Sequence, residues 1–167
     1  MVFNSIMHVT FFAKDINVTK SFYEKLGCKM KMAVKYKAYA DKPHSQYYKK
    51  AQEIPEEYCI IYFEIAPGQF IEIYPSENDQ LPHPQFNKHI GYSHFGVIVE
   101  DIQKTRDFLT QKGITIDIEP KIGNSRTWQM WIHDPDDNRI EIMQYTNDSY
   151  QVASATDFLL MLHFRSG

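Results

Sequence analysis

The sequence predicts an α+β fold in which one βαβββ module occurs twice. The first observation behind this prediction is an internal repeat without gaps, in which residues 8–27 align with residues 94–113 at a constant shift of 86 positions. The second is that three short apolar runs typical of strands follow each copy, and the last run of each places a glutamate between two isoleucines. A chain of 167 residues is long enough to hold both modules in a single domain over residues 1–167.

The first copy begins with a strand that carries one histidine and continues into an amphipathic helix. Asp15 is placed to cap the N-terminus of this helix, and Gly27 suits the left-handed position that follows a helix. Strand-like runs follow at residues 28–34, 58–65 and 70–74. We therefore place module one at about residues 4–75.

The second copy repeats this order. Strand-like runs follow its helix at residues 114–118, 127–133 and 139–145, so module two is expected at about residues 92–146. If the five residues 134–138 form a hairpin loop, Trp131 faces Glu141 across the last two strands, and Gln129 lies on the same face.

Three segments lie outside the repeat. Module one is longer than module two by about 17 residues, which we place within residues 36–58. An insert of this length is either a binding loop or lid, or a surface excursion. The segment rich in Pro, Asn and Asp at about residues 76–91 is the expected linker, and about residues 149–164 are expected to form a short C-terminal helix.

Composition argues against several classes of function. The net charge is -3, and no extended basic patch suggests nucleic-acid binding. Cys28 and Cys59 are too few for a disulfide framework or a thiolate zinc site. No apolar run reaches the roughly 18 residues that span a membrane, and no signal peptide is recognised before the first strand. We expect a cytoplasmic protein with a small-molecule substrate and no nucleic-acid or membrane partner.

Each module carries one histidine in its first strand and one glutamate in its last strand. These residues are His8 and Glu72 in module one, and His94 and Glu141 in module two. Two imidazoles and two carboxylates that converge in one cleft across a pseudo-twofold axis would hold one divalent ion, either zinc, nickel, cobalt, iron or manganese. The alternative is that each histidine and glutamate pairs locally and no metal binds.

The segments "MHVTFFAKDI…SFYEKLG…FIEIYP" and "SHFGVIVEDI…DPDDNRIEIMQ" resemble the glyoxalase I / vicinal oxygen chelate superfamily of glyoxalases, bleomycin resistance proteins and extradiol dioxygenases. The resemblance covers roughly residues 5–146, and its most specific part is "DPDDNRIEIMQ". It implies paired βαβββ modules around one metal held by His8, Glu72, His94 and Glu141. Asp137 stands where the superfamily pattern usually has Gly, a change that the turn should tolerate.

Four ligands resemble the isomerase, epimerase and lyase branches of this superfamily. The resemblance thus implies an enzyme that moves a proton on a small carbonyl or diol substrate through a metal-stabilised enediolate, with Glu141 as the first choice of base and Glu72 as the second. Ring-cleaving dioxygenases use two histidines and one carboxylate, so Glu72 counts against that alternative. A non-catalytic binding protein of the drug-resistance type also stays open, because it needs a cleft without the four ligands. We further expect a homodimer.

Aromatic residues share the strand faces of the expected ligands, which suggests an apolar or aromatic substrate, although ordinary core aromatics would give the same pattern. The residues expected to bind substrate are Phe12, Tyr74, Gln129, Trp131 and Arg126. In bacterial glyoxalase I an arginine four residues after the first histidine holds glutathione, and an asparagine four residues after the first glutamate assists it. Phe12 and Ser76 stand at these positions here, so we expect an enzyme that is not strictly glutathione-dependent.

Overall fold

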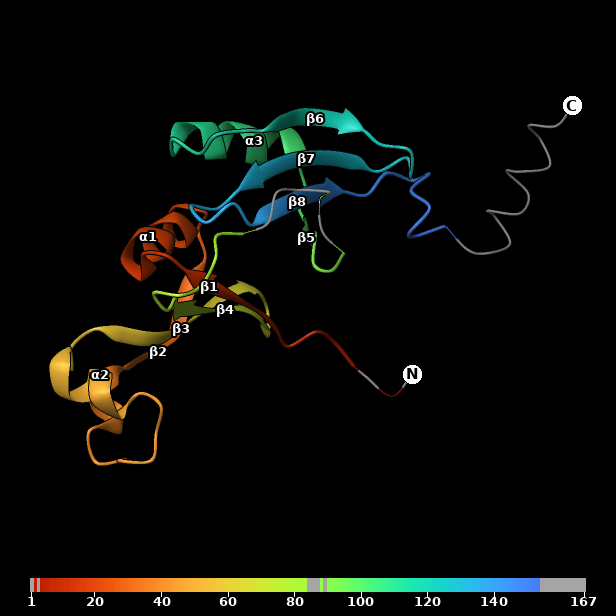
Figure 1. Ribbon diagram of the computed structural model, residues 1–167. Coiled ribbons are helices and arrows are strands. Elements are labelled where there is room, and N and C mark those ends of the chain that lie inside the picture. The colour runs from red at the N-terminus through yellow and green to blue at the C-terminus, as the bar shows by residue number, and fades with distance from the viewer. Residues whose placement is uncertain (1, 3, 84–87, 89, 154–167) are drawn as a thin grey trace, which may run out of the picture. The chain divides into compact units, whose positions relative to one another are not determined.

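The computed structural model describes residues 2, 4–83, 88 and 90–153 (Figure 1). The chain divides into two compact units between Pro82 and His83, and each unit is described by itself. Each unit contains a four-stranded mixed sheet and a ten-residue helix, which confirms the α+β fold of two βαβββ modules. None of the described helices has the length and apolar character needed to cross a membrane.

Unit one contains β1 (His8–Ala13), α1 (Ile16–Lys25), β2 (Lys29–Lys35), β3 (Tyr58–Ala66) and β4 (Gln69–Pro75). Its strand order is β1-β4-β3-β2, with β1 parallel to β4 and the other neighbours antiparallel. This order places the first strand of the module beside the last one. The expected ligands of module one therefore lie on neighbouring strands.

Unit two contains β5 (His94–Ile98), α3 (Ile102–Gln111), β6 (Ile118–Ile122), β7 (Trp128–His133) and β8 (Arg139–Gln144). Its strand order is β5-β8-β7-β6, again with the first strand parallel to the last. The repeat in the sequence thus corresponds to a repeat in topology.

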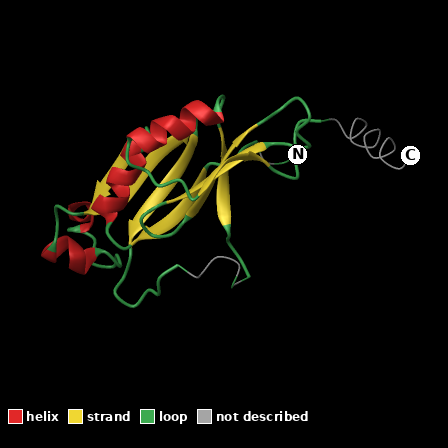
Figure 2. Ribbon diagram, turned by 90° about the horizontal axis from the view of Figure 1, so that it is seen from above, coloured by secondary structure: helices red, strands yellow, loops and turns green. Residues whose placement is uncertain are grey.

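Side chains along a strand point alternately to the two faces of its sheet. In each unit the helix packs on one of these faces, and the other face is called the open face. Figure 2 distinguishes the strands from the helices by colour. Beneath α1, Phe63, Ile71 and Ile73 are fully buried, and the Phe63 ring stacks on Tyr23 of the helix with centroids 5.9 Å apart. The corresponding buried residues near α3 are Met130, Ile132, Ile140 and Ile142. The expected ligands lie on the opposite, open face of each sheet.

Both long helices begin and end as predicted. Asp15 and Asp101 accept hydrogen bonds from backbone N–H groups in the first turns of α1 and α3. Gly27 and Gly113 follow the helices with φ of 88° and 73°, in the left-handed region that favours glycine. These caps fix where each helix turns back toward its sheet.

One strand of module two starts later than predicted. The sequence predicts a strand at residues 114–118, but β6 begins only at Ile118. The physical reason is that Ile114 is buried and its N–H still bonds to the last turn of α3, so the chain must first leave the helix.

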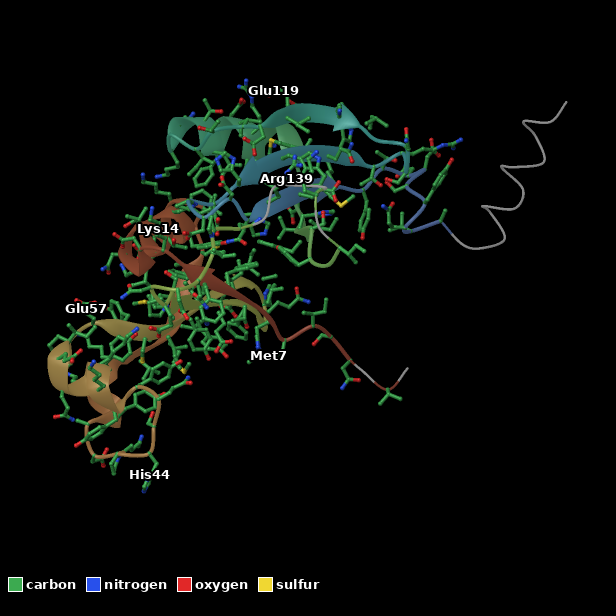
Figure 3. All side chains as sticks on the ribbon, viewed as in Figure 1. Met7, Lys14, His44, Glu57, Glu119 and Arg139 are labelled. Carbon is green, nitrogen blue, oxygen red and sulfur yellow. The ribbon has the colours of Figure 1, made fainter. Side chains whose placement is uncertain are left out.

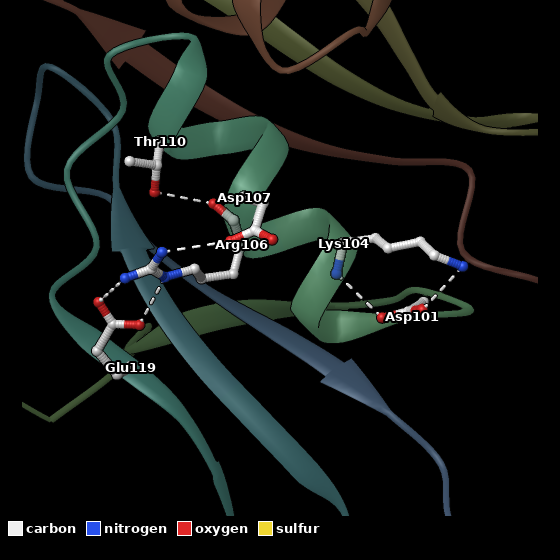
Figure 4. A network of polar contacts seen from close by, with 6 residues as sticks. All are labelled: Asp101, Lys104, Arg106, Asp107, Thr110 and Glu119. Atoms are coloured by element: carbon white, nitrogen blue, oxygen red, sulfur yellow. Dashed lines mark hydrogen bonds and ion pairs between the residues drawn. The ribbon is translucent and has the colours of Figure 1, made fainter.

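An ion pair connects α3 to β6. Arg106 of α3 binds both carboxylate oxygens of Glu119 on β6, at 2.9 and 3.1 Å (Figure 4).

The insert of module one is a folded segment. It contains a short 3-10 helix, η1 (Tyr36–Tyr39), and α2 (Tyr48–Glu53). A small core joins these elements: Tyr36, Ala51 and Cys59 are buried, and Val34, Tyr39, Tyr47, Ile54 and Ile60 pack against them. The insert is therefore anchored to strands β2 and β3 by a small core of its own.

The linker and the C-terminal segment are described only in part. Within the linker, the N–H of Gln80 bonds to the carbonyl oxygen of Glu77 in a turn, whereas residues 84–87 and 89 lie outside the described residues. The sequence predicts a C-terminal helix at residues 149–164. Residues 149–153 form turns instead, and residues 154–164 lie outside the described residues. The side chain of Ser149 accepts a hydrogen bond from Thr127, which ties this turn to unit two.

Candidate metal and substrate site

The open face of the unit-one sheet carries His8 and Glu72 side by side. Parallel pairing of β1 with β4 sets Thr10 opposite Glu72, and His8 precedes Thr10 by one pleat on the same face. The Nε2 atom of His8 lies 3.5 Å from Oε2 of Glu72. Glu72 is only 7% exposed, so its carboxylate requires polar partners.

Three hydroxyl groups supply these partners. The Thr10 hydroxyl donates to Oε2 of Glu72 at 2.7 Å, and the Tyr74 hydroxyl donates to Oε1 at 2.8 Å. Tyr62, opposite Glu72 on β3, donates a further hydrogen bond to the carboxylate. Tyr74 is a predicted site residue, whereas Thr10 and Tyr62 are not. Strand alternation from His8 could have found Thr10, but Tyr62 depends on the register of β3 against β4.

The pKa of the Glu72 carboxyl reflects competing effects. Burial raises this pKa, because it removes water from the charged form. Hydrogen bonds from Tyr62, Thr10 and Tyr74, together with the nearby His8, outweigh burial and lower the pKa below its usual value. Burial and the adjacent Glu72 carboxylate raise the pKa of Tyr62 to about 12 and also raise the pKa of Tyr74. At neutral pH both tyrosines are hydrogen-bond donors to an ionised Glu72.

The open face of the unit-two sheet carries the equivalent pair. Nε2 of His94 lies 3.4 Å from Oε2 of Glu141, and Nδ1 of His94 lies 3.0 Å from the Ser93 hydroxyl. Trp131 faces Glu141 across β7 and β8, as predicted. A hydrogen bond at Nδ1 is the arrangement that leaves Nε2 of a histidine directed at a ligand.

An aromatic and cationic stack borders this second pair. The Trp131 and His94 rings meet edge to face with centroids 4.7 Å apart, and the Arg139 guanidinium carbon lies 4.6 Å from the Trp131 centroid. Figure 3 labels Arg139 at the start of β8. Arg139 is absent from the predicted site residues, although it lies on the same face of β8 as Glu141 and strand alternation indicates this.

The sequence profile of the Glyoxalase/Bleomycin resistance protein/Dioxygenase superfamily matches residues 5–142. The chain belongs to this superfamily. No curated protein matches the sequence. Many solved structures share its fold. A glyoxalase family protein from Enterococcus faecalis is 22% identical with a TM-score of 0.65, and the alignment covers 86% of this chain and 99% of that chain.

Two further similar structures carry more specific names. Lactoylglutathione lyase from Agrobacterium tumefaciens is 15% identical with a TM-score of 0.55, covering 86% of this chain and 96% of that chain. A genomically encoded fosfomycin resistance protein from Listeria monocytogenes is 14% identical with a TM-score of 0.58, covering 89% of this chain and 99% of that chain. At these identities the likeness shows the glyoxalase-superfamily fold alone.

The hairpin that carries the superfamily signature forms around one aspartate. Asp137 adopts φ of 64°, so it takes the left-handed conformation usually supplied by glycine. The Asp134 carboxylate accepts hydrogen bonds from the backbone of Asp136 and from both the backbone and the side chain of Asn138. These bonds fix the turn that leads into β8, and with it the position of Glu141.

The donor atoms of both pairs suit a divalent ion. Two ligands that each lie about 2.1 Å from one tetrahedral ion are about 3.4 Å apart, and the two His–Glu separations match this spacing. Within the described part of the chain, no group of three or more His, Cys, Asp and Glu side chains could hold a metal. The structure thus brings the four predicted ligands together as two pairs, and their convergence on one ion stays a prediction.

The predicted substrate residues fall into two groups. Phe12 and Tyr74 pair across β1 and β4 with ring centroids 5.9 Å apart, and Trp131 borders His94, so these three lie beside the His–Glu pairs. Arg126 instead lies in the β6–β7 loop, where its guanidinium stacks over the Tyr150 ring at 5.3 Å. Arg139, which is not among the predicted residues, lies over the Trp131 ring.

Gln129, the remaining predicted substrate residue, lies on the open face of β7, two residues before Trp131. Its side chain lies so close to Gly123 that a Cβ atom on that glycine would be 2.8 Å from it. The side chain of Gln129 therefore packs over the β6–β7 loop.

Proposed function

We propose that this protein is a metal-dependent lyase or isomerase that transfers a proton on a small carbonyl or diol substrate. The observation that carries the proposal is the pair of His and Glu donors on the open face of each module, with the separation expected for ligands of one ion. A bound divalent ion would polarise the substrate oxygens and stabilise an enediolate. Zinc, nickel, cobalt, iron and manganese all suit this donor set.

Glu141 is the residue we assign to proton transfer. The carboxylate of Glu72 is held by hydroxyl groups on both oxygens, whereas Glu141 faces Trp131 on one side and Gly96 on the other. A carboxylate without such hydroxyl neighbours is the better acceptor of a proton from carbon. The Glu141 side chain is only 14% exposed, so few water molecules compete for its carboxylate.

Proton exchange tests this proposal even before the substrate is identified. Small α-hydroxy carbonyl compounds and α-hydroxy acids are incubated with metal-loaded protein in D2O, and loss of the C–H signal is followed by proton NMR. We expect exchange for at least one compound, and a loss on the order of a hundredfold or more in Glu141→Gln. Exchange that is equally fast in Glu141→Gln would contradict the role of this residue.

The same samples distinguish the other superfamily activities. Bound iron with oxygen uptake on catechols would identify a ring-cleaving dioxygenase. Tight binding of an organic ligand without any exchange would identify a binding protein of the drug-resistance type. We further propose a cytoplasmic homodimer without nucleic-acid or membrane partners, and light scattering after size-exclusion chromatography tests the dimer.

A further inference from the structure

The carboxylate of Glu72 is surrounded by hydroxyl groups from three directions. Thr10 reaches it from β1 at 2.7 Å, Tyr74 from further along β4 at 2.8 Å, and Tyr62 from β3. We infer that Thr10, Tyr62 and Tyr74 are positioning residues that hold Glu72 as a fixed metal ligand, while Glu141 is left able to move a proton. This inference rests on the proposed function and divides its two glutamates into separate roles.

The geometry of the sheet explains why all three hydroxyls reach one carboxylate. Thr10 and Tyr62 are the cross-strand neighbours of Glu72 on its two sides, and Tyr74 follows it by two residues on the same face. All three side chains come from hydrogen-bonded strands of one sheet. A ligand supported in this way keeps its orientation better than one on a loop.

The equivalent positions of unit two carry no hydroxyl. Gly96 and Trp131 are the cross-strand neighbours of Glu141, and Met143 follows it by two residues. Gly96 thus stands in place of Thr10, Trp131 in place of Tyr62, and Met143 in place of Tyr74. The two modules share the His–Glu pair but differ at all three positions around the carboxylate.

This difference has a chemical consequence. Hydrogen bonds to a ligating carboxylate fix its direction, and their removal typically weakens metal affinity about 10- to 100-fold. A carboxylate that serves as a base must instead release its contacts and turn toward the substrate carbon. Glu72 meets the first requirement and Glu141 the second.

The experiment compares metal affinity in variants that each lose one hydroxyl oxygen. Thr10→Val, Tyr62→Phe and Tyr74→Phe are titrated with Co²⁺ against a chelator, and the visible absorption of bound Co²⁺ reports the ligand geometry. We expect each variant to bind Co²⁺ about 10- to 100-fold more weakly than the wild type, with an altered spectrum. Unchanged affinity and spectrum in all three would overturn the inference.

Matched controls separate the hydroxyl from packing. Tyr48→Phe removes a hydroxyl from an exposed tyrosine of α2, and Met143→Leu changes the unit-two counterpart of Tyr74. Both are expected to bind Co²⁺ as the wild type does. Thr10→Ser keeps the hydroxyl and is expected to restore the binding that Thr10→Val loses. If Thr10→Ser binds as weakly as Thr10→Val, packing explains the loss and the inference is overturned.

The design also separates this inference from the proposed function. If the wild type binds no Co²⁺, both are wrong. If the wild type binds Co²⁺ and His8→Ala abolishes binding while the three hydroxyl variants bind normally, the proposed function survives and only the inference is wrong. Thermal unfolding of the metal-free variants confirms that each one is folded.

Discussion

At the scale of single residues, Phe12 bears on which substrates the proposed site would accept. Phe12 stands four residues after His8, where bacterial glyoxalase I enzymes carry an arginine for glutathione. Phe12 is 53% exposed and its ring borders Tyr74, so the surface beside His8 and Glu72 is apolar at this point. An apolar ring cannot replace the charge-assisted hydrogen bonds that a carboxylate of glutathione requires.

We therefore predict weak activity on the hemithioacetal of methylglyoxal and glutathione. Loss of a charged contact costs roughly 1.5 to 3 kcal/mol, about ten- to a hundredfold or more in affinity. Steady-state kinetics with the nickel- and zinc-loaded protein measure this activity. Phe12→Arg is the matched variant, and it should raise kcat/KM for the hemithioacetal. A wild-type kcat/KM of roughly 10⁴ to 10⁸ M⁻¹s⁻¹ would mean that the protein is a glutathione-dependent glyoxalase after all.

We predict that the hydrogen bond from Thr10 to Glu72 stabilises the folded protein at neutral pH and loses this effect in acid. The pKa of Glu72 is lowered in the folded protein, so the stabilisation exists above the unfolded pKa of about 4.3 and is lost as the pH falls through the folded pKa. In metal-free protein, Thr10→Val should reduce the free energy of unfolding by about 1 kcal/mol at pH 7, a modest value because Thr10 itself is exposed to water.

Denaturant unfolding in the presence of a chelator, at pH 7 and in steps down to about pH 3.5, measures this difference. The difference in the free energy of unfolding between the wild type and Thr10→Val should become smaller as Glu72 becomes protonated. Thr10→Ser is the control and should follow the wild type. A difference in the free energy of unfolding that stays constant with pH would show that the valine acts through packing and not through the carboxylate of Glu72.

At the scale of elements, the insert is the feature in which the two modules differ most. Part of the insert packs on Ile60, which lies two residues before Tyr62 on β3 and therefore on the same, open face of the unit-one sheet. Tyr47 is also close enough to Tyr74 to contribute to its raised pKa, after burial and Glu72. The insert thus borders the same surface as Glu72.

We predict that Tyr36→Ala destabilises unit one by about 3 to 5 kcal/mol, because Tyr36 is only 2% exposed at the centre of the insert core. Tyr48→Ala on the exposed side of α2 is the control and should change the free energy of unfolding by less than about 0.5 kcal/mol. Chemical denaturation compares the two variants. Equal stability of Tyr36→Ala and the wild type would mean that the insert does not take part in the core of the unit.

At the scale of the whole molecule, the stoichiometry of metal binding tests whether the two ligand pairs share one ion. If four ligands hold one ion, the wild type binds about one divalent ion per chain. His8→Ala and His94→Ala each leave three of the four ligands and lose an imidazole, so both should retain much less metal than the wild type after purification. His44→Ala, on the insert, is the control (Figure 3) and should keep the metal.

Metal analysis of the purified proteins distinguishes this arrangement from two separate sites. Two ions per wild-type chain, with one retained in each single variant, would show that the pairs bind independently. Full retention in His8→Ala and His94→Ala would remove both residues as ligands. Binding of about one ion by the wild type, lost in both variants, would support a shared site.

Much of the architecture follows from the sequence by itself. The repeat, the Asp15 and Asp101 caps and the alternation around Glu72 and Glu141 are local signals, because a cap or a strand face depends only on residues a few positions apart. Superfamily membership and the two βαβββ modules were predictable for the same reason. The late start of β6 was not, since the apolar residues at 114 and 116 fit a strand equally well until the end of α3 is known.

Only the tertiary structure decided what surrounds each of the two glutamates. Thr10 and Tyr62 are separated from Glu72 by 62 and 10 positions, and they meet it because β1 joins the sheet beside β4 and because β3 pairs with β4 in one register. The strand order and the pairing of β1 with β4 are set by the packing of the whole sheet, because these two strands are far apart in the sequence and no turn connects them. In the sequence, Glu72 and Glu141 occupy equivalent positions of the repeat and could only be ranked as second and first choice of base. Their sheet neighbours separate them, with hydroxyl residues at three positions around Glu72 and none at the equivalent positions around Glu141.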